Sequence, residues 1–229
     1  MQKQKLRVSL AILTYNEIEG VKVIVPRIPK KSLYEVFCVD YNSRDGTVEW
    51  MEKNGIKVVR QESKGRAEAV RIAFKQAKGD SVIIFSPDGN EVPEDIPKLI
   101  KKMEEGYDLV IASRFTKTSK AADAGRMHAF GNKMITFSTN LFHGTHVTDA
   151  INGFRIVDKK AYNKIGGIKA TRHEGDVEMT IKFARAGFRI GEIPTDEPER
   201  IGGKAKIRTF TDGKLYMKTI LKLWKNPGV

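Results

Sequence analysis

Residues 82–90 read VIIFSPDGN, four apolar residues followed directly by a polar turn with an aspartate and an asparagine. A short run rich in Val, Ile and Phe, bounded by turn residues, is typical of a strand buried on both faces of a sheet. Similar runs occur at residues 7–13, 35–39, 56–59 and 109–112. The first half of the chain is therefore expected to supply several buried strands.

Helical patterns separate these strands, at residues 18–25, 47–53, 66–78 and 94–104. Alternating strands and helices predict an α/β fold, with a mostly parallel sheet, right-handed crossovers and helices on both faces. In such sheets ligands bind outside the carboxyl ends of the strands. The polar residues that follow each strand are therefore the first candidates for a functional site.

The second half of the chain is less regular. We expect a helix from residue 126 to about 142, a helix around residues 176–186 and a strand through residues 188–193. No internal repeat and no linker divides the chain. We therefore expect one domain over residues 1–210, followed by a basic amphipathic helix over residues 211–229.

The composition is that of a soluble globular protein that favours anionic partners. The 229 residues include 41 Lys+Arg and 28 Asp+Glu, a net charge of +13. Such an excess suits nucleic acid, an anionic membrane surface or phosphorylated substrates. The chain contains no run of 18 apolar residues, so its sequence predicts no membrane span. The single cysteine, Cys38, excludes an intrachain disulfide, so we expect a reducing, cytoplasmic compartment.

Three carboxylate-bearing loops follow expected strands: LTYNE at residues 13–17, DYNSRDGT at residues 40–47 and SPDGNE at residues 86–91. Any one of them taken alone is typical of a turn. Together they place several carboxylates at one edge of the sheet in a basic chain, which turn formation does not explain. We expect these loops to form a functional site.

These segments resemble the family 2 glycosyltransferases, which have the GT-A fold. The matching motifs of the first half are LTYNE, VDYNSRDGT, KGRAEAVRIAFKQAKGD and the triplet DGN. Downstream motifs are similar to the dolichyl-phosphate mannose synthase branch: SRF at 113–115, TD at 148–149, GFR at 153–155, EIP at 192–194, Arg200 and GKAK at 203–206. The resemblance covers nearly the whole chain.

The resemblance implies a donor site for a nucleotide sugar and a bound Mg²⁺ or Mn²⁺. The implied donor-binding residues are Leu13, Tyr15, Glu17, Asp40, Asp88 and Gly89. Asp88 and Asn90 would hold the metal, a hard cation that prefers oxygen ligands and bridges the diphosphate.

The sequence departs from the family pattern at three positions. Asn90 stands in place of the second acid of Asp-x-Asp, so its amide oxygen offers a ligand without charge. Val92 stands where a further polar metal contact is usual. Tyr41 replaces the second Asp of an Asp-Asp pair.

An acceptor phosphate needs cations more than it needs a general base. Its second ionisation lies near pH ~6, so its oxygen is already anionic at neutral pH. Arginine suits such a group because its fork grips two phosphate oxygens. Our candidates for this role are Arg114, Arg126 and Arg200, which join Asp88 as the expected catalytic residues, with Lys206 as a further candidate.

Two further segments allow two interpretations each. Residues 173–176 (HEGD) suit a helix start with favourable acidic residues, or a general base for a sugar acceptor. In residues 214–225, apolar residues and lysines recur at helical spacing. That pattern is expected of a helix at a membrane interface, or of one that packs on its own domain.

The leading hypothesis is an inverting transferase that moves a sugar, first of all mannose from GDP-mannose, to dolichyl or another polyprenyl phosphate. We expect it to lie peripherally on the cytoplasmic face of a membrane. Alternatives in the same class use UDP-glucose or UDP-N-acetylglucosamine, or transfer to a saccharide or protein hydroxyl. A non-catalytic homologue is an alternative because of Asn90. Nucleic-acid binding is another, but no nucleic-acid motif is present and we expect no such partner.

Overall fold

The computed structural model describes residues 6–116, 118–119, 126–202 and 209–226, without the side chains of 126–128 and 209–211. The strands are β1 (Val8–Thr14), β2 (Glu35–Asp40), β3 (Lys57–Arg60), β4 (Ser81–Phe85), β5 (Leu109–Ser113), β6 (Arg155–Asp158) and β7 (Ile190–Pro194). Within the described residues they form one seven-stranded sheet in the order β3-β2-β1-β4-β6-β5-β7. All neighbouring pairs are parallel except those made by β6, which runs antiparallel to β4 and β5. The predicted α/β fold with a mostly parallel sheet is confirmed.

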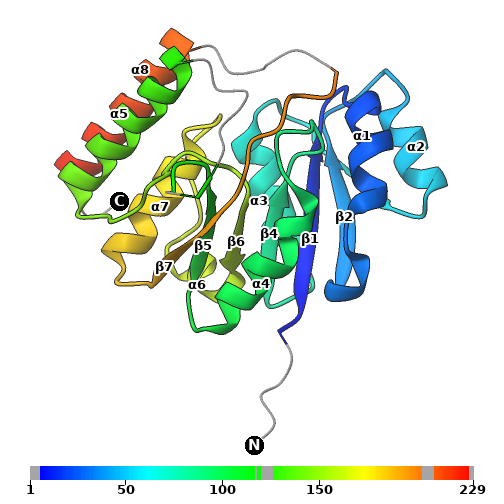
Figure 1. The fold of residues 1–229 in the computed structure, drawn as a ribbon, viewed down its shortest axis with the longest axis horizontal. Coiled ribbons are helices and arrows are strands. Elements are labelled where there is room, and N and C mark those ends of the chain that lie inside the picture. The colour runs from blue at the N-terminus through cyan, green and yellow to red at the C-terminus, as the bar shows by residue number, and fades with distance from the viewer. Residues whose placement is uncertain (1–5, 117, 120–125, 203–208, 227–229) are drawn as a thin grey trace, which may run out of the picture.

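Helices cover both faces of the sheet (Figure 1). They are α1 (Ile18–Ile24), α2 (Thr47–Lys53), α3 (Arg66–Gln76), α4 (Ile96–Glu104), α5 (Arg126–His143), α6 (Lys159–Lys164), α7 (Gly175–Arg185) and α8 (Thr209–Lys225). Short 3-10 turns lie at Val25–Arg27, Lys30–Ser32 and Pro93–Asp95. α1, α2 and α4 share one hydrophobic cluster with the sheet, and α3, α5, α6, α7 and α8 share the other.

The apolar run of β4 shows why both faces need a cover. Val82 and Ile84 point into the cluster under α3 and α7, whereas Ile83 and Phe85 point into the cluster under α1 and α4. Successive side chains alternate between the faces of a strand, so a strand buried on both faces must be apolar throughout. All four side chains are fully buried.

β6 and α6 have no counterpart among the sequence-based predictions. β6 spans only four residues and begins with Arg155, which is fully buried. α6 follows at once, and the carboxylate of Asp158 caps it by accepting a hydrogen bond from the backbone N of Ala161 at 2.7 Å. A strand that is short and opens on a charged residue lacks the apolar pattern used to find the others.

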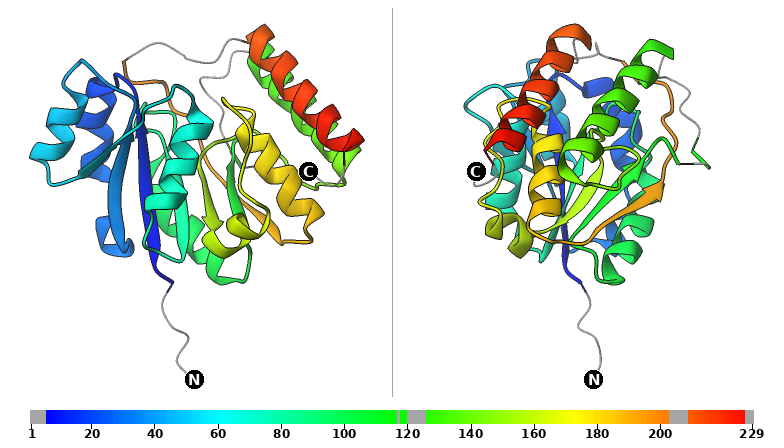
Figure 2. Two further views of the ribbon diagram at one scale, coloured as in Figure 1. Left: turned by 180° about the vertical axis from the view of Figure 1, so that it is seen from behind. Right: turned by 90° about the vertical axis from the view of Figure 1, so that its left-hand side faces the viewer.

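The pair α5 and α8 lies side by side beyond α7 (Figures 1 and 2). α8 buries Tyr216, Ile220 and Leu223, and contacts both α5 and α7. The apolar stripe of the C-terminal helix therefore packs on its own domain, which was one of the two interpretations of its sequence. No helix of the described chain is long and apolar enough to cross a membrane.

Candidate functional site

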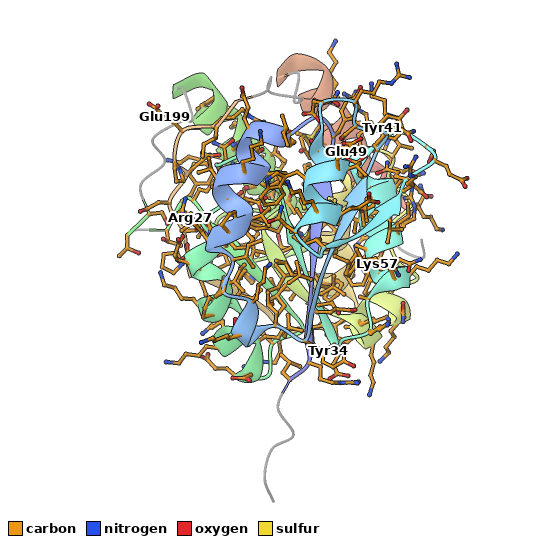
Figure 3. All side chains as sticks on the ribbon, turned by 90° about the vertical axis from the view of Figure 1, so that its right-hand side faces the viewer. Arg27, Tyr34, Tyr41, Glu49, Lys57 and Glu199 are labelled. Carbon is orange, nitrogen blue, oxygen red and sulfur yellow. The ribbon has the colours of Figure 1, made fainter. Side chains whose placement is uncertain are left out.

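A cleft of about 1480 Å³ lies at the carboxyl ends of the parallel strands. Loops that follow β1, β2, β3, β4 and β5 line it, together with parts of α5, α7 and α8. Figure 3 shows Tyr41 and Glu199 at this end of the molecule and Tyr34 at the opposite end. Of the predicted site residues, the cleft brings together Leu13, Tyr15, Glu17, Asp88, Asn90, Arg114 and Arg200.

The turn that contains Asp88 is held by the segment that follows β7. The backbone O of Asp88 accepts a hydrogen bond from the backbone N of Ile201 at 2.8 Å. A Cβ on Gly89 would lie 2.8 Å from Cγ1 of Ile201, and Gly89 has a φ of +94°. Only glycine fits a position with both constraints. Gly89 is buried, and its contribution to the site is that its missing side chain lets Ile201 pack directly against the turn.

The Asp88 carboxylate carries an ion pair inside the cleft. Oδ2 of Asp88 accepts a hydrogen bond from Nη2 of Arg200 at 2.6 Å, and Nη1 of Arg200 lies 3.5 Å from Oε1 of Glu17. Glu17 is buried and Arg200 is largely so. Arg200, which is expected to bind the acceptor phosphate, therefore contacts both Asp88, a predicted metal ligand, and Glu17, a residue predicted to bind the sugar donor.

Two tyrosines form an aromatic wall of the cleft. The ring centroids of Tyr15 and Tyr41 are 5.3 Å apart, and Nζ of Lys64 lies 6.0 Å from the centroid of Tyr15. The loops that carry them contain Asn16 and Asn42, both with positive φ, at 53° and 49°. Asparagine tolerates this left-handed conformation better than most residues. Tyr41 thus contributes a ring where the family pattern has an acid.

Asp40, predicted as a base or ribose contact, lies behind this wall. It is 1% exposed and accepts hydrogen bonds from Oγ1 of Thr14 at 2.7 Å and from the backbone N of Ser43 at 2.8 Å. These bonds hold the end of β1 against the loop after β2. The structure therefore gives Asp40 a bracing role, and its contact with a nucleoside stays a prediction.

The residues at the Asp88 turn fit a divalent cation that arrives with a diphosphate. Asp88 offers a carboxylate, and Asn90 offers an amide whose nitrogen donates to the backbone O of Pro198 at 2.8 Å. No cluster of three or more Asp, Glu, His or Cys in the described part of the chain is arranged to hold a metal. Mg²⁺ commonly takes one or two protein ligands and completes its shell with substrate phosphates and water. Oδ2 of Asp88 is already paired with Nη2 of Arg200, so a metal would share this carboxylate with the guanidinium.

Glu91, which directly follows Asn90, is a site residue that the sequence did not single out. It lines the cleft, and its Oε2 accepts a hydrogen bond from the backbone N of Ser86 at 2.7 Å. Burial raises the pKa of Glu91 to about 8, against the lowering effect of Arg66.

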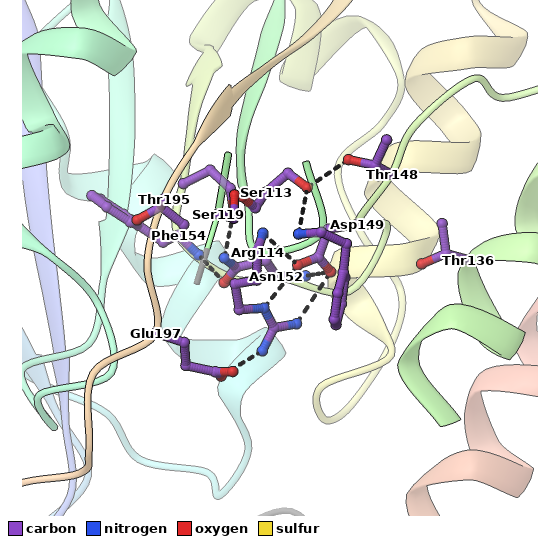
Figure 4. A network of polar contacts seen from close by, with 12 residues as sticks. Ser113, Arg114, Ser119, Thr136, Thr148, Asp149, Asn152, Phe154, Thr195 and Glu197 are labelled. Carbon is purple, nitrogen blue, oxygen red and sulfur yellow. Dashed lines mark hydrogen bonds and ion pairs between the residues drawn. The ribbon is translucent and has the colours of Figure 1, made fainter. Parts of the chain in front are cut away.

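Arg114 lies between two carboxylates (Figure 4). Its Nε and Nη2 grip both oxygens of Asp149 at 2.7 and 3.1 Å, and its Nη1 donates to Oε1 of Glu197 at 2.7 Å. Asp149 is fully buried, and Glu192 accepts a hydrogen bond from its backbone N at 3.1 Å. The two carboxylates outweigh the effect of burial and raise the pKa of Arg114. If Arg114 binds the acceptor phosphate as predicted, that phosphate becomes a further anion in this network of ion pairs.

The other predicted cations are described only in part. Arg126 is the first residue of α5, and its side chain is outside the description. Lys206 lies outside the described residues altogether. Their expected contacts with an acceptor phosphate stay predictions.

Arg66, the first residue of α3, is a second site residue that sequence reasoning missed. Its Nε donates to Oδ2 of Asp176 at 3.1 Å and its Nη1 to Oγ of Ser86 at 3.2 Å, while its Nη2 has no hydrogen-bond partner among the described residues. A Cβ on Gly153 would lie 1.9 Å from that Nη2. Gly153 therefore makes room for the guanidinium. The sequence feature that could have pointed to Arg66 is its position at an expected helix start, directly after Lys64 and Gly65.

Asp176 supplies the negative charge that offsets Arg66 and Arg155 in this part of the cleft. Burial raises its pKa, but the guanidiniums of Arg66 and Arg155 outweigh burial, so the pKa of Asp176 is lowered. Glu174 precedes α7 and accepts a hydrogen bond from the backbone N of Thr171 at 2.9 Å. The expected helix start at residues 173–176 is confirmed, and it directs an ionised carboxylate into the cleft.

The family model described as glycosyl transferase family 2 matches residues 9–166. The chain belongs to this family. The match contains the turn of Asp88, the tyrosine wall and Arg114, so the cleft is built mainly from the part of the chain that defines the family.

Two relatives of the chain have names that include a lipid acceptor. A dolichyl-phosphate hexose transferase of Haloferax volcanii is 29% identical over 92% of this chain and 90% of its own. A dolichol-phosphate mannosyltransferase of Pyrococcus furiosus is 28% identical over 97% of this chain, which spans 65% of that protein.

Among solved structures, glucosyl-3-phosphoglycerate synthase of Mycobacterium tuberculosis, in complex with Mn²⁺, UDP-glucose and phosphoglyceric acid, superposes with a TM-score of 0.80. It is 17% identical and is matched over 96% of this chain and 80% of its own. This likeness shows that the family 2 chain has the GT-A fold.

Proposed function

We propose that this chain transfers a sugar from a nucleotide-sugar donor to a polyprenyl phosphate with inversion at the anomeric carbon. One observation carries the proposal: the cleft collects Arg66, Arg114 and Arg200, each held by carboxylates, beside the Asp88 turn and an aromatic wall. Preorganised guanidiniums suit two anionic ligands that must approach each other closely.

The donor half of the cleft would bind the nucleoside and its diphosphate. The base stacks on the wall of Tyr15 and Tyr41, since aromatic rings accept any base on their faces. Asp88 and Asn90 would hold Mg²⁺ or Mn²⁺. When bound, the metal neutralises the charge that develops on the departing nucleoside diphosphate.

The acceptor half requires no general base. A phosphate oxygen of the lipid, already anionic at neutral pH, forms the new bond to the anomeric carbon. The bond from that carbon to the diphosphate oxygen breaks, and its electron pair leaves with the nucleoside diphosphate. Arg114 and Arg200, with Arg126, orient the acceptor phosphate and offset repulsion between the two anions. The names of the Haloferax and Pyrococcus relatives support a dolichyl or similar polyprenyl phosphate.

GDP-mannose is the first donor to test, because the Pyrococcus relative is named a mannosyltransferase. UDP-glucose and UDP-N-acetylglucosamine are the alternatives. Tyr41 replaces an expected acidic contact with a ring, so the wall favours stacking over a base-specific hydrogen bond.

A second acceptor class has one observation in its favour. Asp176 is an ionised carboxylate that lines the cleft, as a general base for a saccharide hydroxyl would be. Its ion pair with Arg66 makes it a weak base, which favours the phosphate acceptor.

A lipid acceptor places the enzyme at a membrane surface. We propose peripheral attachment on the cytoplasmic face, where anionic headgroups attract a chain of net charge +13.

The test is a transfer assay that crosses the three nucleotide sugars with a short polyprenyl phosphate, with and without Mn²⁺. Asp88→Ala should abolish the product, whereas Asp80→Ala, which removes an exposed carboxylate paired with Arg7, should leave it unchanged. Equal product from Asp88→Ala and from the native chain would refute the proposal.

A further inference from the structure

The exposed side of α5 is apolar. Among its described side chains, residues 129–143, the exposed positions are Phe130, Lys133, Met134, Phe137 and Leu141. The four apolar side chains are 66%, 45%, 60% and 65% exposed, respectively. They follow one another at spacings of three and four residues, so they form one stripe along the helix. A helix of a soluble domain ordinarily places charged residues on such a face.

The neighbouring helix presents cations and an indole. Among the described side chains of α8, the exposed positions are Lys214, Lys218, Lys222, Trp224 and Lys225. α8 contacts α5, and the ring of Trp224 lies 5.3 Å from that of Phe142. The exposed positions described on the two helices therefore include four large apolar residues, five lysines and a tryptophan, and no carboxylate.

The stripe begins inside the candidate cleft. Phe130 and Met134 line it, as do Lys214 and Met217 of α8. Phe137 and Leu141 continue the stripe away from the cleft along α5. A ligand with its charged end among the arginines would thus meet a continuous apolar path that leads out of the cleft.

We infer that the stripe of α5 and the lysines of α8 together form a docking surface for an anionic lipid bilayer, in which the mouth of the cleft faces the headgroups. The inference rests on the proposed function and specifies how the acceptor reaches the site. The apolar side chains enter the boundary between headgroups and acyl chains, and Trp224 lies at the headgroup level. The lysines meet the anionic phosphates.

Charge complementarity selects this occupant over a second copy of the chain. Two copies joined through this face would bring two sets of lysines together without carboxylates among the described exposed positions to balance them. An anionic bilayer supplies the opposite charge, and each lysine near such a surface adds to binding in a way that salt weakens.

The experiment is vesicle co-sedimentation of the full chain. The vesicles contain phosphatidylcholine alone, or phosphatidylcholine mixed with phosphatidylglycerol. The test variant is Phe137→Gln/Leu141→Gln, because both residues lie outside the cleft lining. The matched control is Val23→Gln/Tyr34→Gln, which removes two side chains of similar exposure, 48% and 52%, from another part of the molecule.

The native chain and the control should bind the anionic vesicles alike, and much more strongly than the neutral ones. The test variant should bind at least roughly tenfold more weakly. Lys218→Glu/Lys222→Glu should remove the preference for anionic lipid. Equal binding by the native chain and the test variant would overturn the inference. So would light scattering that shows a dimer for the native chain, a monomer for the test variant, and vesicle binding by neither.

Nucleotide binding separates this inference from the proposed function. Thermal stabilisation by Mn²⁺ with GDP or UDP should be the same in the native chain and the test variant. Transfer to a short acceptor in solution without vesicle binding would refute the docking surface alone. Vesicle binding without transfer for any donor would refute the proposed function and leave the docking surface in place.

Discussion

Nη2 of Arg200 lies 2.6 Å from Oδ2 of Asp88. The residue predicted to bind the acceptor phosphate is therefore paired with the residue predicted to bind the metal. Because the guanidinium repels a second cation, Arg200→Gln should strengthen Mn²⁺ binding in the absence of nucleotide, by roughly fivefold for about 1 kcal/mol of repulsion removed. Transfer should fall in the same variant.

Mn²⁺ titration followed by electron paramagnetic resonance measures the affinity without any need for turnover. Arg7→Gln, which removes an exposed arginine paired with Asp80, is the control for the loss of a positive charge. Unchanged or weaker Mn²⁺ binding by Arg200→Gln would show that Arg200 and the metal do not share the carboxylate.

The tyrosine wall predicts how nucleotides bind. Tyr15→Ala or Tyr41→Ala should weaken binding of GDP or UDP by about 1–3 kcal/mol, the range for stacking of a base on an aromatic ring. Tyr→Phe at the same positions should retain most of the affinity, since the ring remains. Calorimetric titration provides the measurement, and an affinity for Tyr41→Ala equal to that of the native chain would exclude stacking there.

The network around Arg114 predicts a large effect on stability. Asp149→Ala leaves a largely buried guanidinium without its main partner and should lower the free energy of unfolding by about 3–5 kcal/mol. Glu94→Gln breaks an exposed pair with Arg27 and should cost less than about 1 kcal/mol. Urea unfolding compares the two, and similar losses would contradict the assigned burial of Asp149.

These long-range pairs mark the limit of what could be predicted from the sequence. The strands of the first half, and the meeting of their loops at one edge, followed from apolar runs and from the geometry of parallel sheets. The partners of the arginines did not follow, because Arg114 and Glu197 are 83 residues apart and Arg200 and Asp88 are 112 apart. Residue type indicates that an arginine suits phosphate, but only the fold shows which carboxylate holds it.

The helix α8 illustrates the same limit at the surface. Its sequence allowed its apolar stripe to face a membrane or its own domain, and periodicity is identical in both cases. The structure buries Tyr216, Ile220 and Leu223 and leaves the stripe of α5 exposed instead. Which of two amphipathic helices faces outward depends on their packing, which no single segment encodes.

His173 predicts a pH dependence of stability. Burial, with the nearby Arg66, lowers the pKa of His173 from 6.5 to about 4. The neutral imidazole of the folded chain therefore contributes stability above pH about 6.5, and this contribution is lost as the pH falls towards 4, because the unfolded chain binds the proton first. His173→Gln should remove this part of the dependence.

Unfolding by urea across that pH range measures the difference between the native chain and His173→Gln. His146→Gln is the control for the loss of an exposed imidazole. Parallel curves for the native chain and His173→Gln would contradict the lowered pKa of this half-buried histidine.

The most direct test of the central claim compares two acceptors that differ only in the phosphate. The native chain is incubated with Mn²⁺, a labelled nucleotide sugar and either a short polyprenyl phosphate or the corresponding free alcohol, and the label extracted into the organic phase is counted. The account predicts a labelled lipid with the phosphate and none with the alcohol. Transfer to the alcohol or to a saccharide, with none to the phosphate, would contradict it.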